Sequence, residues 1–156
     1  MDRLWAPWRY AYVKAKKHKN CIFCRGLKSK SKNYVIYKTK YSISLLNIFP
    51  YNNGHVMISP VRHVKDFSLL KEAEIVDLFK TLNKVKKSLD KFLKPHGYNI
   101  GINISPDAGA GITGHLHLHI VPRWKGDTNF MPVLFNTKVI SQSLGELCRK
   151  LQNELC

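Results

Sequence analysis

The most informative run of the chain is Gly114-His115-Leu116-His117-Leu118-His119-Ile120-Val121-Pro122-Arg123. Imidazole and apolar side chains alternate strictly along it, which predicts a β-strand because successive strand side chains point to opposite faces. Its three histidines, His115, His117 and His119, therefore share one face, and the apolar residues between them face the core. Chance enrichment in histidine poorly explains three imidazoles at period two. We expect a metal site, a nucleophile or both, since neutral imidazole serves either purpose.

Four other strand patterns precede this run. Three short β-type segments precede it, and Pro50 with Asn52-Asn53-Gly54 gives the strongest turn signal among them. A further alternating segment leads through a loop of small residues into the histidine strand. The predicted strands cover 34–37, 43–48, 55–59, 98–104 and 115–121, and the loop covers 105–114. Hairpin connections imply antiparallel pairing, so we expect an antiparallel sheet of about five strands.

In two segments the apolar residues recur with a period of 3.6 residues, which predicts helices. The first begins near Lys71 and ends before Pro95 and Gly97. Its predicted buried face carries Ile75, Phe79, Leu82, Val85, Leu89 and Phe92. The predicted buried face of the terminal helix carries Ile140, Leu144, Leu147, Leu151 and Leu155. The order β-β-β-α-β-β-α fits a single α+β domain over residues 1–156, with two helices packed on one face of the sheet.

Length and composition exclude several classes of protein. The 156 residues, 44% hydrophobic and 11% aromatic, exclude a wholly disordered or collagen-like chain. No segment approaches the roughly 18 to 20 apolar residues of a membrane span. The first 17 residues carry charge where a signal peptide needs an apolar core. We therefore expect a cytoplasmic protein with no membrane partner.

The charge balance is strongly basic. Lys and Arg number 26 against 10 acidic residues, a net charge of +16, which permits an anionic partner without choosing among nucleotide, nucleic acid and membrane surface. Ten of the positive charges lie within 14–40, so much of the imbalance is local. Residues 14–32 are predicted to be a lysine-rich surface loop. Most aromatic residues lie outside this loop, so a nucleic-acid partner is not required.

Four cysteines occur, and Cys21 and Cys24 form a Cys-x-x-Cys pair within the lysine-rich segment. Thiols stay reduced in a cytoplasmic chain, so an even cysteine count does not indicate disulfides. The spacing supplies half of a tetrahedral zinc site, although unmetallated thiols and redox pairs share it. Cys148 and Cys156 lie far from this pair in sequence and are expected to have no special role.

The loop between Asn103 and Gly114 is rich in small residues. Backbone N–H groups of such a loop can approach a phosphate closely. The loop lacks the Gly-Lys-Thr ending of a Walker motif, and a plain turn is the simpler interpretation. Its position directly before the three histidines favours a phosphate site.

Together these motifs resemble the histidine triad (HIT) superfamily, whose hallmark is His-x-His-x-His followed by apolar residues. The resemblance extends to the nucleotide-side strands of that superfamily, and the opening and a late segment resemble its bacterial branch related to diadenosine tetraphosphate phosphorylases. The matching segments are Leu4–Arg9, Asn47–Pro50, Gly54–Pro60, Arg62-His63, His115–Arg123 and Gly126–Val133. Only the lysine-rich stretch is unmatched, so a HIT-like fold is implied.

The resemblance implies a nucleotidyl transferase or hydrolase. His117 would attack the α-phosphorus of a nucleoside phosphate and carry the nucleotide transiently. His119 would bind phosphate oxygens or the leaving group, and Asn103 with the loop N–H groups would stabilise phosphoryl charge. Asn47 matches the position that holds the ribose hydroxyls. His55 either orients the site or is a satisfied core histidine.

Two positions in the phosphate loop depart from the better-known hydrolase branch. Gly111 and Ile112 replace a Gln and a Ser or Thr, and the loop is one residue longer. Together with Thr113 they are expected to contact the substrate phosphate, with more space behind the phosphorus. That space favours inorganic phosphate over water as acceptor, hence phosphorolysis of diadenosine tetraphosphate-type dinucleoside polyphosphates to ADP and ATP. The alternatives are a HIT hydrolase of dinucleoside polyphosphates or nucleoside phosphoramidates, and a non-catalytic basic nucleotide- or RNA-binding module.

The resemblance also implies a metal site and an oligomer. In zinc-containing members, the cysteine pair is joined by a histidine after the third strand and by the first triad histidine. These correspond to His63 and His115, so a structural zinc on Cys21, Cys24, His63 and His115 is implied. His115 would then support the site structurally, His117 would act covalently and His119 would give polar support. A homodimer is the implied assembly.

Overall fold

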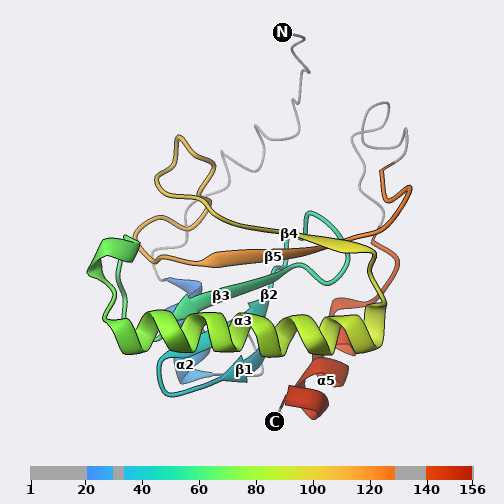
Figure 1. Cartoon of the computed structure of the whole chain (residues 1–156), viewed down its shortest axis with the longest axis horizontal. Coiled ribbons are helices and arrows are strands. Elements are labelled where there is room, and N and C mark those ends of the chain that lie inside the picture. Colours follow the sequence, from blue (N-terminus) through green and yellow to red (C-terminus); the bar gives the residue numbers. More distant parts are fainter. Residues whose placement is uncertain (1–20, 30–33, 129–139, 156) are drawn as a thin grey trace, which may run out of the picture.

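The computed structural model of the chain describes residues 21–29, 34–128 and 140–155 (Figure 1). The elements are α2 (Ile22–Lys28), β1 (Val35–Lys38), β2 (Ser42–Leu46), β3 (Val56–Pro60), the 3-10 helix η2 (Phe67–Leu69), α3 (Glu72–Leu93), β4 (Gly97–Ile102), β5 (Leu118–Arg123) and α5 (Leu144–Leu155). This order confirms the predicted α+β succession and adds a helix, α2, that was not predicted. Within these ranges, no helix is long and apolar enough to cross a membrane.

One antiparallel sheet of five strands organises these elements, in the order β1-β2-β3-β5-β4. The central pairing joins Ile58 on β3 to Leu118 on β5, and Ile120 on β5 pairs with Ile100 on β4. Strands β1 and β4 therefore form the two edges. The predicted five-stranded antiparallel sheet is confirmed.

The main core lies between one face of the sheet and helices α3 and α5, as predicted. Figure 1 shows α3 crossing in front of the sheet, with α5 beside its C-terminal half. Side chains from both layers are buried together, among them Ile36, Val56, Ile58, Leu82, Val85, Leu89, Leu118, Ile120, Leu147 and Leu151. Burial of this apolar surface is the main stabilising contribution to the fold. Cys148, expected to have no special role, packs in this core.

Helix α2 covers the opposite face of the sheet, which corrects the prediction of a loop over 14–32. Phe23 is fully buried against a second apolar cluster on this face, formed with Val35, Ile43, Leu45 and Met57. A Cβ atom on Gly26 would lie 3.0 Å from Val35 Cγ2, so glycine lets the helix approach the sheet closely. Lysine-rich composition suggested a loop, but burial of one aromatic side chain holds this part as a helix. The remainder of 14–32, apart from Cys21 and Ser29, lies outside the described residues.

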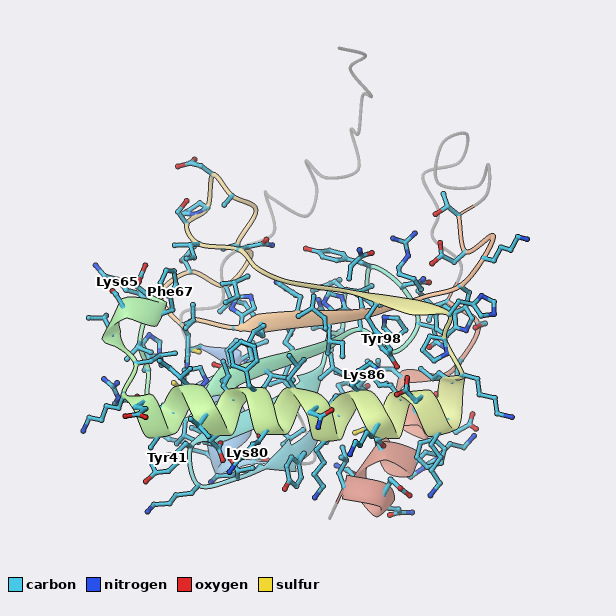
Figure 2. All side chains as sticks on the ribbon, in the orientation of Figure 1. Tyr41, Lys65, Phe67, Lys80, Lys86 and Tyr98 are labelled. Carbon is cyan, nitrogen blue, oxygen red and sulfur yellow. The ribbon has the colours of Figure 1, made fainter. Side chains whose placement is uncertain are left out.

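The buried face of α3 also differs from the prediction. Leu82, Val85 and Leu89 are buried as expected, but Ile75, Phe79 and Phe92 are exposed, and Leu78 takes a core position. Ile75 and Phe79 lie on the flank of α3 nearest β4. Positions eleven residues further on, Lys86 and Asp90, share that flank because eleven residues make about three turns. Figure 2 shows the Tyr98 side chain of β4 pointing toward Lys86, and the Tyr98 hydroxyl donates to Asp90 over 2.8 Å.

The histidine strand begins later than predicted. β5 starts at Leu118, so His115 and His117 precede the ladder and only His119 lies within it. The preceding segment is held by other bonds: Leu116 N–H donates to Val64 O, and Ser59 Oγ donates to Leu116 O. Leu118 and Ile120 do face the main core, as the alternation predicts.

Candidate functional site

The three histidines of the motif lie on the α2 face of the sheet, and a fourth, His55, joins them from the residue directly before β3. His55, His115, His117 and His119 are all buried, with between 0% and 9% of their surface exposed. Buried imidazoles need hydrogen-bond partners. Those partners, many of them backbone groups whose donor or acceptor role is fixed, determine which ring nitrogen carries each proton.

His115 takes part in a Cys/His cluster. Its Nε2 lies 2.9 Å from the Pro60 carbonyl oxygen, which can only accept, so Nε2 carries the proton. Its Nδ1 lone pair therefore points toward Cys21 Sγ at 3.1 Å and Cys24 Sγ at 3.8 Å. His63 Nδ1 lies 3.2 Å from Cys24 Sγ. The structure thus brings together the four residues predicted from the family resemblance.

This Cys/His cluster has the size of a tetrahedral metal site. The four ligand atoms all lie within 4.8 Å of one another. Tetrahedral zinc, with bonds of about 2.0 Å to nitrogen and about 2.3 Å to sulfur, places ligand atoms about 3.3 to 3.8 Å apart. Two thiols and two imidazoles are a donor set that zinc prefers. The cluster could therefore hold a metal ion with small adjustments of side chains.

His117 has one ring nitrogen held by a hydrogen bond, and its other ring nitrogen has no hydrogen-bond partner within residues 21–29, 34–128 and 140–155. Its Nδ1 lies 2.8 Å from the carbonyl oxygen of His115, so Nδ1 donates and Nε2 keeps its lone pair. The Phe23 ring lies against both His115 and His117, with centroid distances of 5.1 and 5.3 Å. Helix α2 therefore contributes Cys24 to the cluster and an aromatic contact to His117, and Cys21 directly precedes it.

His55 and His119 form a directed chain of hydrogen bonds. The Tyr51 N–H and the Asn47 side-chain amide both donate to His55 Nδ1, over 3.1 and 3.3 Å. His55 Nε2 consequently carries the proton and donates to His119 Nδ1 over 2.9 Å. His119 therefore bears its proton on Nε2, a buried atom with no hydrogen-bond partner in the part of the chain that the structure describes. A donor is left facing the site without an acceptor.

Burial keeps these rings neutral at pH 7. Desolvation lowers the pKa of His55 to about 3 and that of His119 to about 4, with smaller contributions from neighbouring imidazoles. Desolvation also lowers the pKa of His117, partly opposed by its bond to the His115 carbonyl. A neutral imidazole with a defined tautomer can act as a nucleophile or as a hydrogen-bond donor, according to which nitrogen faces the reactant.

The predicted phosphate loop lines a cavity of about 300 Å³ beside His115. Asn103, Ile112 and Thr113 line it, and so does Lys65, which the sequence did not single out. The Gly109 and Ala110 N–H groups donate within the loop, to Pro106 O and Ser105 O, so they are already satisfied. Any backbone donors for a phosphate must therefore come from other residues of the loop.

Two other predicted substrate residues, Gly111 and Asn47, are not among the residues that line this cavity. Gly111 is exposed on the loop, and Asn47 lies at the end of β2, where its Oδ1 accepts from Phe49 N–H over 2.9 Å. Sequence reasoning missed Tyr51, whose ring lies 4.6 Å from His55 and 5.9 Å from His119. It also missed the contact of Phe23 with His117. No local pattern distinguishes these aromatic rings from ordinary apolar residues.

Known proteins resemble this chain at three levels: a family model, relatives in sequence and solved structures. The HIT domain family model matches residues 28–126. A protein named AP-4-A phosphorylase from Mycobacterium tuberculosis is 33% identical over 99% of this chain and 84% of its own length. An asymmetrical bis(5'-nucleosyl)-tetraphosphatase from Schizosaccharomyces pombe is 39% identical over 60% of this chain and 50% of its own length.

Solved structures share the fold. A Zn-bound histidine triad family protein from Mycobacterium smegmatis superposes with a TM-score of 0.69 at 24% identity, covering 86% of this chain and 92% of that one. At this identity the likeness concerns the fold alone. The family match, the relative that spans nearly the whole chain and the shared architecture agree, and the chain belongs to the HIT domain family.

Proposed function

We propose that the protein is a nucleotidyl-transfer enzyme that cleaves diadenosine tetraphosphate-type dinucleoside polyphosphates through a nucleotidyl-His117 intermediate. The observation that carries this proposal is the tautomer of His117. Because Nδ1 donates to the His115 carbonyl, the Nε2 lone pair is available for attack without prior deprotonation. The names of the M. tuberculosis and S. pombe relatives support the substrate class.

The proposed reaction has two displacements. His117 Nε2 forms a bond to the α-phosphorus while the bond from that phosphorus to the bridging oxygen breaks, and ATP leaves. An oxygen of inorganic phosphate then attacks the same phosphorus, the N–P bond breaks and ADP is released. Since Nδ1 keeps its proton throughout, the nucleotidylated ring carries positive charge and remains a good leaving group.

His119 and the loop would stabilise the charge that develops on phosphorus. The unpartnered His119 Nε2–H is a donor already oriented by His55, so little reorganisation is needed when an anionic oxygen arrives. Asn103 and Thr113 line the adjacent cavity and are assigned to the phosphoryl oxygens. Asn47, at the end of β2, is assigned to the ribose hydroxyls.

The acceptor is assigned as inorganic phosphate. Gly111 offers no side chain, and Ile112 packs partly against the Phe23 cluster, so neither residue supplies a side-chain hydrogen bond behind the phosphorus. The near full-length relative named as a phosphorylase supports this choice. Hydrolysis, with water as acceptor, is the second candidate because the S. pombe relative is named as a tetraphosphatase.

Product analysis with and without phosphate decides between the two acceptors. The protein is incubated with diadenosine tetraphosphate after exhaustive removal of phosphate, and phosphate is then added back. Phosphorolysis yields ADP and ATP only when phosphate is present. Equally fast turnover without phosphate, with release of AMP, would establish the hydrolase instead. The absence of turnover under both conditions would refute nucleotidyl transfer.

We infer further that Cys21, Cys24, His63 and His115 hold a structural zinc ion. All four positions of a tetrahedron are filled by protein donors, so the metal would fix α2 and the His115 ring and would not bind substrate. The donor set of two thiols and two imidazoles supports the choice of zinc. We place the protein in the cytoplasm, where the two thiols stay reduced and able to bind metal.

A homodimer is the proposed assembly. Strand β4 is an edge of the described sheet, and Ile100 and Ile102 on it are exposed beside Ile75 and Phe79 of α3. An apolar patch next to a free strand edge is a surface that proteins usually cover. A second copy of the chain would cover this surface, with β4 of one protomer paired with β4 of its partner. Light scattering should show a dimer, and Ile102→Glu should yield a monomer.

A further inference from the structure

A second cavity lies on the histidine face of the sheet, beyond His119. It has a volume of about 260 Å³, and Tyr51, Asn52, Asn99, Arg123 and Asp127 contribute to its walls. This volume is slightly below the usual range of about 300 to 1,000 Å³ for complete small-molecule sites. The cavity therefore has room for part of a ligand.

The position of this cavity relates it to the proposed reaction. His119, Val121 and Arg123 alternate along β5 and so share one face, and Asn99 pairs with Val121 on β4. The phosphate-loop cavity lies at the other end of the same run, beside His115. His117 and His119 therefore lie between the two cavities. A phosphorus that reacts at His117 would have one cavity on each side, with room for a different part of the substrate in each.

Tyr51 gives the second cavity a flat wall. Its ring packs on His55 and lies nearly parallel to His119, with 29° between the planes, yet the residue is 51% exposed. An aromatic ring supported on one side and accessible on the other is a surface on which a base can stack.

The charges in the wall favour an uncharged ligand. Arg123 donates to both carboxylate oxygens of Asp127, over 2.6 and 2.9 Å, and its third nitrogen donates to Asn99 Oδ1 over 2.7 Å. The guanidinium and the carboxylate neutralise each other, so the cavity has little attraction for a phosphate. Asn52 is buried, and its amide nitrogen donates to Pro122 O and Asp127 Oδ2, so it serves the wall of the cavity. The amide nitrogen of exposed Asn99 suits the hydrogen-bonding rim of a nucleobase.

We propose that this cavity binds the purine base of the departing nucleotide, which makes it the site that distinguishes dinucleoside from mononucleoside polyphosphates. The inference rests on the proposed function and extends it, because it assigns the second nucleoside of the substrate. Tyr51 would stack on the base, and the Arg123–Asp127 pair would keep the site neutral.

The test compares two substrates that differ only in the second nucleoside, diadenosine tetraphosphate and adenosine 5'-tetraphosphate. For the wild type we expect kcat/KM to be about tenfold higher for diadenosine tetraphosphate, after allowance for its two equivalent ends. Asn99→Trp, which enlarges an exposed side chain at the wall of the cavity, should reduce this ratio to about one. Lys80→Trp, on the solvent side of α3, is the control that should retain it.

Tyr51 provides a second test that does not depend on the folding of the tryptophan variant. Tyr51→Ala should lower the ratio, and Tyr51→Phe should retain it because stacking needs the ring and not the hydroxyl. A wild-type ratio near one, or an unchanged ratio in folded Asn99→Trp or in Tyr51→Ala, would overturn the inference. Failure of the wild type to cleave either substrate would instead refute the proposed function, and the inference with it.

Discussion

His115, the member of the Cys/His cluster that lies in the ten-residue histidine run, is held differently from His117 and His119 further along that run. His115 faces two thiols and a third partner, His63, all contributed by side chains distant in sequence. His117 and His119 are oriented by chains that end at backbone groups, the His115 carbonyl and the Tyr51 N–H. The first arrangement brings four potential ligand atoms together, whereas the second leaves a lone pair on His117 and a donor on His119 without partners among the described residues.

This difference separates structure from chemistry within a single motif. A four-ligand cluster with no open position stabilises its surroundings but has nothing to offer a substrate. A ring with one nitrogen bound and the other free is prepared for a reactant. Substitutions in the two regions should therefore affect different properties of the protein, metal content and stability in one case and turnover in the other.

Removal of the nucleophile should have the largest effect. His117→Ala should lower kcat for diadenosine tetraphosphate by many orders of magnitude, because the lost nitrogen forms a bond only along the reaction path. Nucleotide binding, measured by calorimetry, and metal content should remain close to wild type. Residual activity above about a hundredth of the wild-type rate would contradict covalent catalysis by His117.

Disruption of the Cys/His cluster should act on stability first. We expect Cys24→Ser to lose the metal and to lower the melting temperature by several degrees or more, since metal binding contributes directly to folding free energy. Metal analysis and a thermal melt measure both effects. Cys148→Ala, which removes a buried thiol outside the cluster, should retain about one zinc per chain. Wild-type protein that carries no zinc after expression in zinc-replete medium would remove all four ligands from the proposed site.

Loss of the group that orients His119 should have a smaller effect on catalysis. His55→Ala should lower kcat about tenfold with little change in KM, because His119 then loses the donor that fixes its tautomer. His55→Gln should recover part of the rate, since a glutamine amide can also donate to His119 Nδ1. Nitrogen NMR of His119 should show its proton on Nε2 in the wild type and a mixture of tautomers in His55→Ala. An unchanged tautomer population in His55→Ala would exclude this role.

The buried histidines should also make stability depend on pH. His55 has its pKa lowered to about 3 in the folded protein, against an ordinary value near 6.5 in the unfolded chain. The unfolded state therefore binds more protons between these values, and stability should fall as the pH decreases from 6.5 to 4. Urea unfolding at several pH values should give a slope that is steeper in the wild type than in His55→Gln, by at most about 1.4 kcal/mol per pH unit. Equal slopes would show that His55 is not buried in neutral form.

Sequence patterns predicted the sheet well and the helix faces less well. The alternation through Leu118 and Ile120 identified a core strand, and the period of α3 identified Leu82 and Val85 as core residues. The same period also assigned Phe79 to the core, because apolar residues on α3 extend over a wide arc and periodicity cannot tell the centre of that arc from its flank. Only the position of α3 relative to β4 decides this.

The candidate site was predicted where residue type and spacing are distinctive. The Cys-x-x-Cys pair and the three histidines are visible in the sequence, but their meeting with His63 depends on contacts 39 to 94 residues apart and was expected only from the family resemblance. The chain from Tyr51 through His55 to His119 could not be predicted, since it depends on backbone groups whose direction the sequence does not reveal. Helix α2 was missed because the burial of Phe23 outweighed a lysine-rich composition.

Trapping the nucleotidyl-His117 intermediate tests covalent catalysis by His117. Rapid quenching of the protein with diadenosine tetraphosphate in phosphate-free buffer, followed by peptide mass spectrometry, should reveal one adenylyl group on His117. Addition of phosphate before quenching should remove that group and release ADP. An adenylyl group on another residue, or turnover with no modified protein at any time, would contradict the assignment of His117 as the nucleophile.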